Sequence, residues 1–326
     1  MKVAVLPGDG IGPEITPAAT RALGELAPDL ELVEAPFGAA GIRGFGTPIP
    51  EDTLRACKEA DAVLKGPIGD PEFDAADVRP EQGVFVLRSE LGVYANFRPA
   101  RDDGTDLVIV RELLGGIYYG ARGVRDDGTV YDTCEYRPDQ VERIVRRSFE
   151  LARRRSRKLT SIDKANVLET SRMWRRVVHD VAVDYPDVEL QDMLVDNAAM
   201  QLARAANQFD VLVADNMFGD ILSDLAAAVT GGVGLAPSAS LGDGPGGLFE
   251  PVHGSAPDIA GRGCANPSAM LRSTAMMLDL AFDRQDEARA LEDAVDRAIA
   301  STPTPDIDGS ASTVEFADAV MAALAS

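Results

Sequence analysis

Long apolar runs, cysteine and histidine are scarce in this sequence of 326 residues. No run approaches the roughly 20 apolar residues that a membrane-spanning helix needs, so we expect no such helix. Cys57, Cys134 and Cys264 are odd in number and far apart, which excludes a disulfide framework and the usual spacing of metal ligands. The chain opens directly on MKVAVLPGDG, without a signal-like segment, and we therefore expect a cytoplasmic protein.

Basic side chains are also scarce, because 32 lysines and arginines face 53 acidic residues and the net charge is −21. Binding to a nucleic acid backbone needs a basic surface, so nucleic acid is not an expected partner. Only 5 of the basic residues are lysines. A salt-adapted surface and a high-GC genome both account for the exchange of lysine for arginine. The genome explanation alone does not account for the acidic excess.

Strand and helix patterns, by contrast, alternate along the whole chain. We predict strands at 2–6, 30–34, 61–65, 106–110, 159–163, 188–194 and 210–214. We predict helices at 13–27, 50–60, 139–157, 170–184, 197–206, 219–229, 268–281, 284–301 and 312–325. This alternation is typical of an α/β fold with a largely parallel sheet. The glycine- and proline-rich stretch 231–267 is interpreted as ligand-contacting loops within discontinuous domains.

A glycine-rich turn, GDGIG at 8–12, separates the first predicted strand from the first predicted helix. With Glu34 at a later strand end, it imitates a dinucleotide-binding fingerprint. The spacing lacks the third glycine of G-x-G-x-x-G, and Pro13 follows at once. A tight turn or a loop that touches a cofactor is therefore favoured over a true Rossmann fingerprint.

Two aspartates, Asp220 and Asp224, lie four residues apart at the start of the predicted helix 219–229. This spacing puts both carboxylates on one helical face. Neighbouring carboxylates repel each other unless a cation lies between them, and oxygen ligands suit Mg²⁺ or Mn²⁺. The alternative is that they compensate the helix dipole.

Three arginines are candidates for binding an anionic substrate: Arg88, Arg98 and Arg111. Arg111 directly follows the predicted strand 106–110, and an arginine buried there needs an anionic partner. Together, three guanidinium groups would clamp a di- or tricarboxylate. Taken singly, each is more typical of a surface ion pair.

Lys164 follows the predicted strand 159–163, and lysine can lose its proton near neutral pH where arginine cannot. It is a candidate base, with an exposed lysine as the alternative. Tyr118, in GGIYYG, is a candidate phenolic acid or a core residue. His253 and Asp258 lie in a loop of small residues, where a ring could approach the backbone and a carboxylate could bind a ribose. A purely structural loop is the alternative.

Seven segments occur in the order found in β-decarboxylating dehydrogenases: MKVAVLPGDGIGPE, RPEQGVFVLR, ANFRPA, VRELLGGIYYG, DKANVLE, FGDILSDLA and EPVHGSAPDIAGRGCANP. Nearly end to end, the chain therefore resembles the isocitrate/isopropylmalate dehydrogenase family. The resemblance implies this family's two-domain α/β fold with a mixed, largely parallel sheet, which is not a Rossmann fold. Residues 1–93 and 231–326 would form the cofactor-side domain. Residues 94–230 would form the dimerising domain that binds metal and substrate.

The resemblance also implies roles for individual residues. Tyr118 and Lys164 match the catalytic acid and base. The residues matched to substrate binding are Arg88, Arg98, Arg111, Asp220, Glu81, Val84 and Phe85. Those matched to NAD binding are Ile11, Gly69, His253, Gly254, Ser255, Ala256, Asp258, Ile259 and Asn266. Asp196, Asp220 and Asp224 match the metal ligands, and in a homodimer Lys164 and Asp196 would reach the partner subunit's site.

The activity implied is metal-dependent oxidative decarboxylation of 3-isopropylmalate to 4-methyl-2-oxopentanoate, with NAD reduction, in leucine biosynthesis. The alternatives are a related enzyme for D-malate, tartrate or homoisocitrate, and a non-catalytic, effector-binding subunit. Most family members of the implied specificity carry two leucines where this chain has Val84 and Phe85. The connection from Arg98 to Asp106 is also short for the family. The apolar run at 84–86 favours an alkyl malate over isocitrate.

Overall fold

A computed structural model describes residues 1–244 and 246–325. The chain divides into two compact units. Unit 1 comprises Met1–Val93 and Gly232–Ser326, and unit 2 comprises Tyr94–Gly231. Both ends of the chain therefore belong to unit 1, and unit 2 is a continuous segment.

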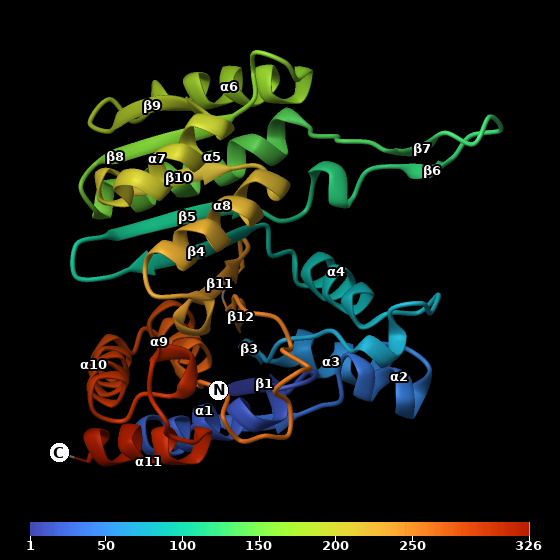
Figure 1. The fold of residues 1–326 in the computed structure, drawn as a ribbon. Helices are drawn as coiled ribbons and strands as arrows, with labels where there is room; N and C mark the ends of the chain where they lie inside the picture. The colour runs from blue at the N-terminus through green and yellow to red at the C-terminus, as the bar shows by residue number, and fades with distance from the viewer. Residues whose placement is uncertain (245, 326) are drawn as a thin grey trace. The chain divides into compact units, whose positions relative to one another are not determined.

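Unit 1 is built on five strands in the order β2-β1-β3-β12-β11 (Figure 1). Their bounds are β1 Lys2–Leu6, β2 Glu31–Glu34, β3 Ala62–Lys65, β11 Pro237–Leu241 and β12 Leu248–Pro251. β1, β2, β3 and β12 run parallel, and β11 pairs antiparallel with β12. The apolar residues of β1, β3 and β12 are buried on both faces, as expected for a parallel sheet covered by helices.

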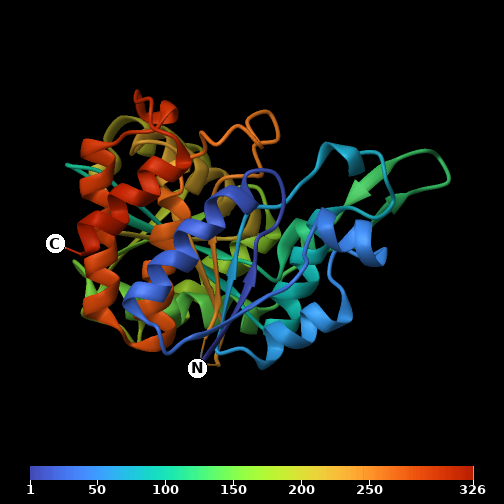
Figure 2. The ribbon, with the colours of Figure 1, turned by 90° about the horizontal axis from the view of Figure 1, so that it is seen from below.

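Two groups of helices cover the strands of unit 1. α1 Gly12–Leu26, α9 Ser268–Phe282, α10 Gln285–Ser301 and α11 Thr313–Leu324 share one apolar core with the strands. Figure 2 shows these helices side by side. α3 Glu51–Glu59 and α4 Pro80–Leu91 contribute to a second core, and α2 Ala39–Phe45 precedes them in the chain. α4 begins at a proline, which suits the first turn of a helix, and ends at Gly92 with φ 63°.

Unit 2 repeats this plan with the strand order β4-β5-β10-β8-β9. The bounds are β4 Ala95–Arg101, β5 Asp106–Glu112, β8 Lys158–Asp163, β9 Glu189–Leu194 and β10 Val211–Ala214. β4 and β5 are antiparallel, and the other pairs are parallel. α5 Pro138–Arg154 and α6 Glu169–Ala182 share one core, and α7 Val195–Ala205 and α8 Asn216–Val229 share the other. The hairpin of β6 Arg122–Val124 and β7 Val130–Asp132 extends away from the rest of this unit (Figure 1).

The predicted strands and helices are confirmed to within a few residues at each end. Three expectations about position are wrong. The segment 231–267 is not entirely loop, since it contains β11 and β12. Arg111 lies within β5, because the strand continues to Glu112. Asp220 does not lie at a helix start, since α8 begins at Asn216. Among the described residues, no helix is both long enough and apolar enough to cross a membrane.

Candidate active site

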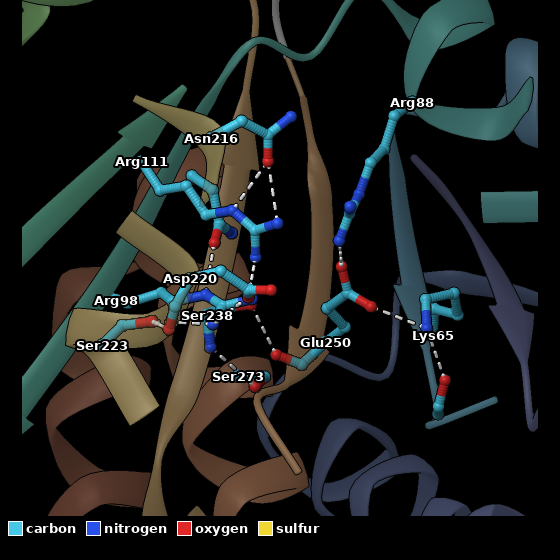
Figure 3. A network of polar contacts seen from close by, with 12 residues as sticks. Lys65, Arg88, Arg98, Arg111, Asn216, Asp220, Ser223, Ser238, Glu250 and Ser273 are labelled. Carbon is cyan, nitrogen blue, oxygen red and sulfur yellow. Dashed lines mark hydrogen bonds and ion pairs between the residues drawn. The ribbon is translucent and has the colours of Figure 1, made fainter. Parts of the chain in front are cut away.

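A carboxylate held between two arginines forms the centre of a polar cluster in unit 2 (Figure 3). Arg98 lies on β4 and Arg111 on β5, and both side chains are largely buried. The Nη1 atom of each donates to Oδ1 of Asp220, from Arg98 at 3.2 Å. A buried guanidinium group is costly unless an anion meets it, and Asp220 supplies that anion. The structure thus brings together three of the residues predicted to bind substrate.

Asp224 lies one turn after Asp220 on α8, on the side that faces Arg98. Nη1 of Arg98 lies 3.4 Å from Asp224 Oδ1 and donates to Ser223 Oγ at 2.8 Å. The N-cap of α8 is Asp215, whose side chain accepts a hydrogen bond from a backbone N–H of the first turn. Asp220 and Asp224 follow in later turns, where the effect of the helix dipole has faded. Compensation of the dipole therefore does not explain this pair.

The chemistry of this pair fits a divalent cation. Partial burial and, more weakly, the charge of Asp220 raise the pKa of Asp224 above its usual range, while the charge of Arg98 opposes the shift. Two carboxylates one helical turn apart offer the hard oxygen ligands that Mg²⁺ and Mn²⁺ prefer. Within residues 1–244 and 246–325, no three His, Cys, Asp or Glu side chains lie close enough together to hold a metal. A single chain thus offers two of the three predicted metal ligands, Asp220 and Asp224, in this cluster.

Tyr118 contacts the other carboxylate oxygen of the same aspartate. Its hydroxyl donates to Oδ2 of Asp220 at 3.3 Å, and its ring centroid lies 5.7 Å from the guanidinium carbon of Arg111. Burial, and secondly the Asp220 carboxylate, raise the pKa of the phenol. Tyr118 therefore carries its proton at neutral pH, as a proton donor must.

Asn216, which the sequence reasoning did not single out, joins Arg111 to the loop that carries Tyr118. Its Oδ1 accepts from Nε and Nη2 of Arg111 at 3.1 and 2.8 Å. Its Nδ2 donates to the carbonyl of Gly115 at 3.0 Å, and its backbone N–H donates to the hydroxyl of Tyr136 at 2.9 Å. The available signal was its place in DNMFGDILSD, beside the two aspartates.

Lys164 and Asp196 form a separate pair within unit 2. Lys164 follows β8, Asp196 lies in the first turn of α7, and Nζ donates to Oδ1 at 2.5 Å. The lysine lowers the pKa of Asp196. No hydrogen bond or ion pair joins either residue to Tyr118, Asp220 or Asp224 among the described residues. The two residues predicted to act at the partner subunit's site thus lie together.

Arg88, the third predicted substrate arginine, lies on α4 of unit 1. Its Nη2 donates to Oε1 of Glu250 at 3.0 Å, and the other oxygen of Glu250 lies 2.6 Å from Nζ of Lys65 (Figure 3). Neither Lys65 nor Glu250 had a role predicted from the sequence. The signal for Lys65 was the one used for Lys164, a scarce lysine at a strand end.

The remaining predicted substrate residues on α4 differ in exposure. Val84 is buried in the core that α4 shares with the strands, whereas 37% of Phe85 is exposed. Glu81 is exposed in the first turn and lies beside Gly69, where an added Cβ would be 3.2 Å from its Oε1. Of the pair predicted to line the alkyl pocket, Phe85 is therefore the side chain that solvent or a ligand can reach.

The predicted NAD-binding residues of unit 1 converge on the turn after β1. The N–H of Ile11 donates to the carbonyl of Ser255 at 2.9 Å. Gly10, with φ 56°, lies so close that a Cβ would be 2.0 Å from that carbonyl oxygen. Asp9 accepts from the N–H of Gly69 at 3.0 Å. The glycine turn thus contacts the predicted NAD loop.

The loop that follows β12 has the features of a cradle for a polar ligand. Nδ1 of His253 bonds to the carbonyl of Gly254 at 2.9 Å, but its buried Nε2 has no partner among the described residues. Burial lowers the pKa of His253, so the ring is neutral at pH 7. Ala256 holds a φ of 42°, and Asp258 is exposed. The orphaned buried nitrogen and the exposed carboxylate, which both belong to this loop, fit the base and ribose of a nucleotide.

The other loop residues fix the shape of this cradle. Ile259 packs against the core of unit 1, together with Ala256. Asn266 is buried and bonds to both Asp306 and the N–H of Ser268. Glu14, on α1, accepts from the backbone N–H groups of Gly261 and Gly263. The loop is therefore held by α1 on one side and by the start of α9 on the other.

The pattern of the isocitrate/isopropylmalate dehydrogenase family matches residues 2–320, and the chain belongs to this family. A 3-isopropylmalate dehydrogenase of Zymomonas mobilis is 51% identical, covering 99% of this chain and 100% of the relative. A second 3-isopropylmalate dehydrogenase, from Shouchella clausii, is 48% identical, and the match covers 99% of this chain and 97% of that relative. The crystal structure of isocitrate dehydrogenase from Methylococcus capsulatus superposes with a TM-score of 0.93 at 38% sequence identity. The superposition covers 100% of this chain and 99% of that structure's chain. The predicted fold is thereby confirmed.

Proposed function

We propose that this protein catalyses the oxidative decarboxylation of 3-isopropylmalate with NAD⁺ as the hydride acceptor. Identity of about half over the full length with 3-isopropylmalate dehydrogenases supports this substrate. The observation that carries the chemistry is the cluster in which Tyr118, Arg98 and Arg111 all contact Asp220. In this proposal a proton donor, cations for carboxylates and a metal ligand would act within one hydrogen-bonded group.

Arg88, Arg98 and Arg111 would bind the two carboxylates of the substrate. Arg98 and Arg111 now satisfy their charge on Asp220, so they must exchange that partner for a substrate carboxylate. The exchange is feasible because Asp220 is a third exposed and Asp224 is more than half exposed. Once Arg98 and Arg111 bind the substrate, Asp220 and Asp224 would be free to hold a divalent cation. Substrate and metal binding are therefore expected to favour each other.

Asp220 and Asp224, with Asp196 of a second chain, would hold Mg²⁺ or Mn²⁺, and the loop 253–266 would hold NAD. When bound, the cation acidifies the substrate hydroxyl and stabilises an enolate, and the nicotinamide accepts a hydride from C2. Lys164 would take the proton of the C2 hydroxyl during oxidation. Tyr118, which carries its proton at neutral pH, would protonate C3 after CO₂ has left.

Asp258 supports a preference for NAD⁺ over NADP⁺, because its exposed carboxylate would repel a 2′-phosphate. The stretch 254–266 contains no Lys-Tyr pair that would attract one. We expect kcat/KM to be at least tenfold higher with NAD⁺, the effect of about 1.4 kcal/mol. Equal values for the two cofactors would contradict this assignment. The homodimer and the cytoplasmic location remain predictions.

The deciding experiment compares kcat/KM for 3-isopropylmalate, D-malate, homoisocitrate and isocitrate, with NAD⁺ and Mg²⁺ present. We expect 3-isopropylmalate to be the best substrate, because Phe85 and its apolar neighbours suit an alkyl group. A higher value for another diacid would assign the protein to that substrate. Absence of turnover with all four would favour a non-catalytic subunit.

A further inference from the structure

Three charged side chains of unit 1 form a buried group at the carboxyl ends of two adjacent strands. β3 and β12 run parallel with Leu64 opposite Phe249, so the next residues, Lys65 and Glu250, are also neighbours. Nζ of Lys65 lies 2.6 Å from Oε2 of Glu250, and Nη2 of Arg88 lies 3.0 Å from Oε1. The exposed fractions of the three side chains are 2%, 10% and 11% for Lys65, Glu250 and Arg88.

The group contains two cations and one anion, so one positive charge is not compensated within it. Burial alone would raise the pKa of Glu250, but attraction by Lys65 and Arg88 outweighs it and holds the pKa at about 2. Glu250 is therefore ionised at every pH at which the enzyme would work. Each of its oxygens serves a different cation, so the carboxylate fixes the separation of the ammonium and guanidinium groups.

The guanidinium group of Arg88 still has donors to offer. Its bond to Glu250 uses one Nη2 hydrogen, and its buried Nε has no partner among the described residues. A buried donor without an acceptor is costly, and such groups in native proteins usually meet a ligand or water. An unpaired donor beside an excess positive charge points to an anionic ligand.

We propose that Glu250, itself anchored by Lys65, is a positioning residue that orients Arg88 for a carboxylate of the substrate. This inference rests on the proposed function, in which Arg88 binds substrate. Glu250 does not touch the reacting atoms; it occupies one edge of the guanidinium group and so aims the remaining donors. Lys65 keeps Glu250 in place and leaves the group with a net positive charge that attracts the carboxylate. A site held in this way loses little entropy on binding.

The first test is Glu250→Gln, which keeps the shape of the side chain and removes its charge. We expect KM for the diacid to rise about 10- to 100-fold, the effect of one charge-assisted hydrogen bond, with kcat changed much less. KM for NAD⁺ should stay within about twofold of the wild-type value. A rise confined to KM for NAD⁺ would overturn the proposal and assign Glu250 to the cofactor.

Glu250→Gln also leaves two buried cations without a counter-ion, which by itself lowers the stability of the fold. The effect of this lower stability on KM must therefore be distinguished from the effect of a misplaced Arg88. The double variant Lys65→Met/Glu250→Gln removes one cation together with the anion and should recover most of the lost Tm. If Glu250 positions Arg88, KM remains raised in the double variant. Recovery of KM together with Tm would overturn the proposal, because Glu250 would then act only by neutralising Lys65.

A matched control is available in unit 2, where Asp210 bonds to Arg155 at 2.5 Å and is largely buried. Asp210→Asn should lower Tm and leave the diacid KM unchanged. The wild-type comparison of four substrates judges the proposed function separately. If another diacid proves best, the proposed function fails, and the same three variants assayed with that diacid still decide the role of Glu250.

Discussion

Unit 1 of this protein is far more acidic than unit 2, yet its polar cluster is the more positive of the two. Unit 1 has 13 basic and 30 acidic residues and a net charge of −17. Unit 2 has 19 basic and 23 acidic residues and a net charge of −4. Yet the cluster of unit 1 has two cations around one carboxylate, and that of unit 2 balances two arginines against two aspartates. Local charge at a site is thus set independently of the surface around it.

The two clusters also differ in how their partners are shared. In unit 1, Glu250 gives each cation its own oxygen within a buried group. In unit 2, Arg98 and Arg111 share the same oxygen of Asp220, and Asp224 is 60% exposed. A carboxylate with exclusive partners suits a fixed scaffold, whereas shared, exposed partners suit a site that must exchange them for metal and substrate.

The largest effect is expected for the proposed acid and base. Tyr118→Phe and Lys164→Ala homodimers should each lose roughly 10²–10⁴-fold in kcat, because each removes a proton-transfer group. If Lys164 acts at the partner subunit's site, heterodimers of the two variants should regain activity at one of two sites. The measurement is steady-state turnover of co-purified, differently tagged chains. Verified heterodimers without any regained turnover would contradict the shared site.

Variants of the two clusters should differ in the metal concentration that they need for activity. Asp224→Asn removes one proposed ligand, and we expect the Mg²⁺ or Mn²⁺ concentration for half-maximal activity to rise roughly 10- to 100-fold. Glu250→Gln should leave that concentration unchanged, because Glu250 belongs to the fixed cluster. Metal titrations of both variants at saturating substrate provide the comparison. Equal shifts in the two variants would abolish the distinction between the clusters.

Glu112, the fully buried neighbour of Arg111 on β5, should make the stability of the protein depend on pH. Its carboxylate accepts from the N–H groups of Leu114 and Gly115, at the start of the loop that carries Tyr118. Burial raises its pKa to about 7, although those bonds and Arg143 oppose the shift. Between pH 4.5 and 7 the folded state therefore binds a proton that the unfolded state has released. The free energy of unfolding should fall with rising pH across this window, by about 3 kcal/mol from this group.

Glu112→Gln keeps an acceptor for the loop and cannot titrate. The difference in free energy of unfolding between wild type and variant should therefore shift in favour of the variant as the pH rises from 4.5 to 7, and stay constant above pH 8. Urea titrations at several pH values measure it. Parallel pH profiles for the two proteins would show that Glu112 does not keep a raised pKa.

The smallest effect per residue is expected for the surface acidic residues, whose mutual repulsion lowers Tm. Measuring this effect compares the two units most directly. Self-repulsion among acidic residues destabilises the folded state at low salt, and at about 1 M salt the Debye length falls to about 3 Å. We expect Tm to rise between about 0.1 and 3 M KCl. A flat or falling Tm would remove the salt-adapted interpretation and leave the enzyme assignment unaffected.

Two triple variants compare the units at equal charge change. In unit 1 the exposed residues replaced are Glu25→Gln, Glu59→Gln and Asp293→Asn. In unit 2 they are Glu150→Gln, Asp180→Asn and Glu189→Gln. Because repulsion is concentrated in unit 1, its variant should raise Tm at low salt and flatten the salt dependence, while the unit 2 variant changes little. A genome-wide drift in composition acts on the whole chain and does not explain a charge concentrated in one unit.

The sequence by itself determined the alternation of strands and helices and the residues of most of the candidate site. Apolar periodicity and proline or glycine at helix ends are local properties, so β1, α1 and α9 could be predicted from short windows. The motifs around Arg98, Lys164 and Asp220 were readable because each is contiguous. The resemblance to the family then joined them, and the match of residues 2–320 confirms the family.

Only the tertiary structure decided which charges meet. Glu250 and Arg88 are 162 residues apart in the sequence, and their contact depends on the register of β12 beside β3 and on the placement of α4. The strands β11 and β12 themselves escaped prediction, because short segments with proline at their ends form strands only when a neighbouring strand supplies hydrogen bonds. In the same way, Asn216 became part of the site through distant partners on β5 and in the loop of Tyr118. Ion pairs and cross-strand contacts are non-local interactions, and a single sequence records the residues but not their partners.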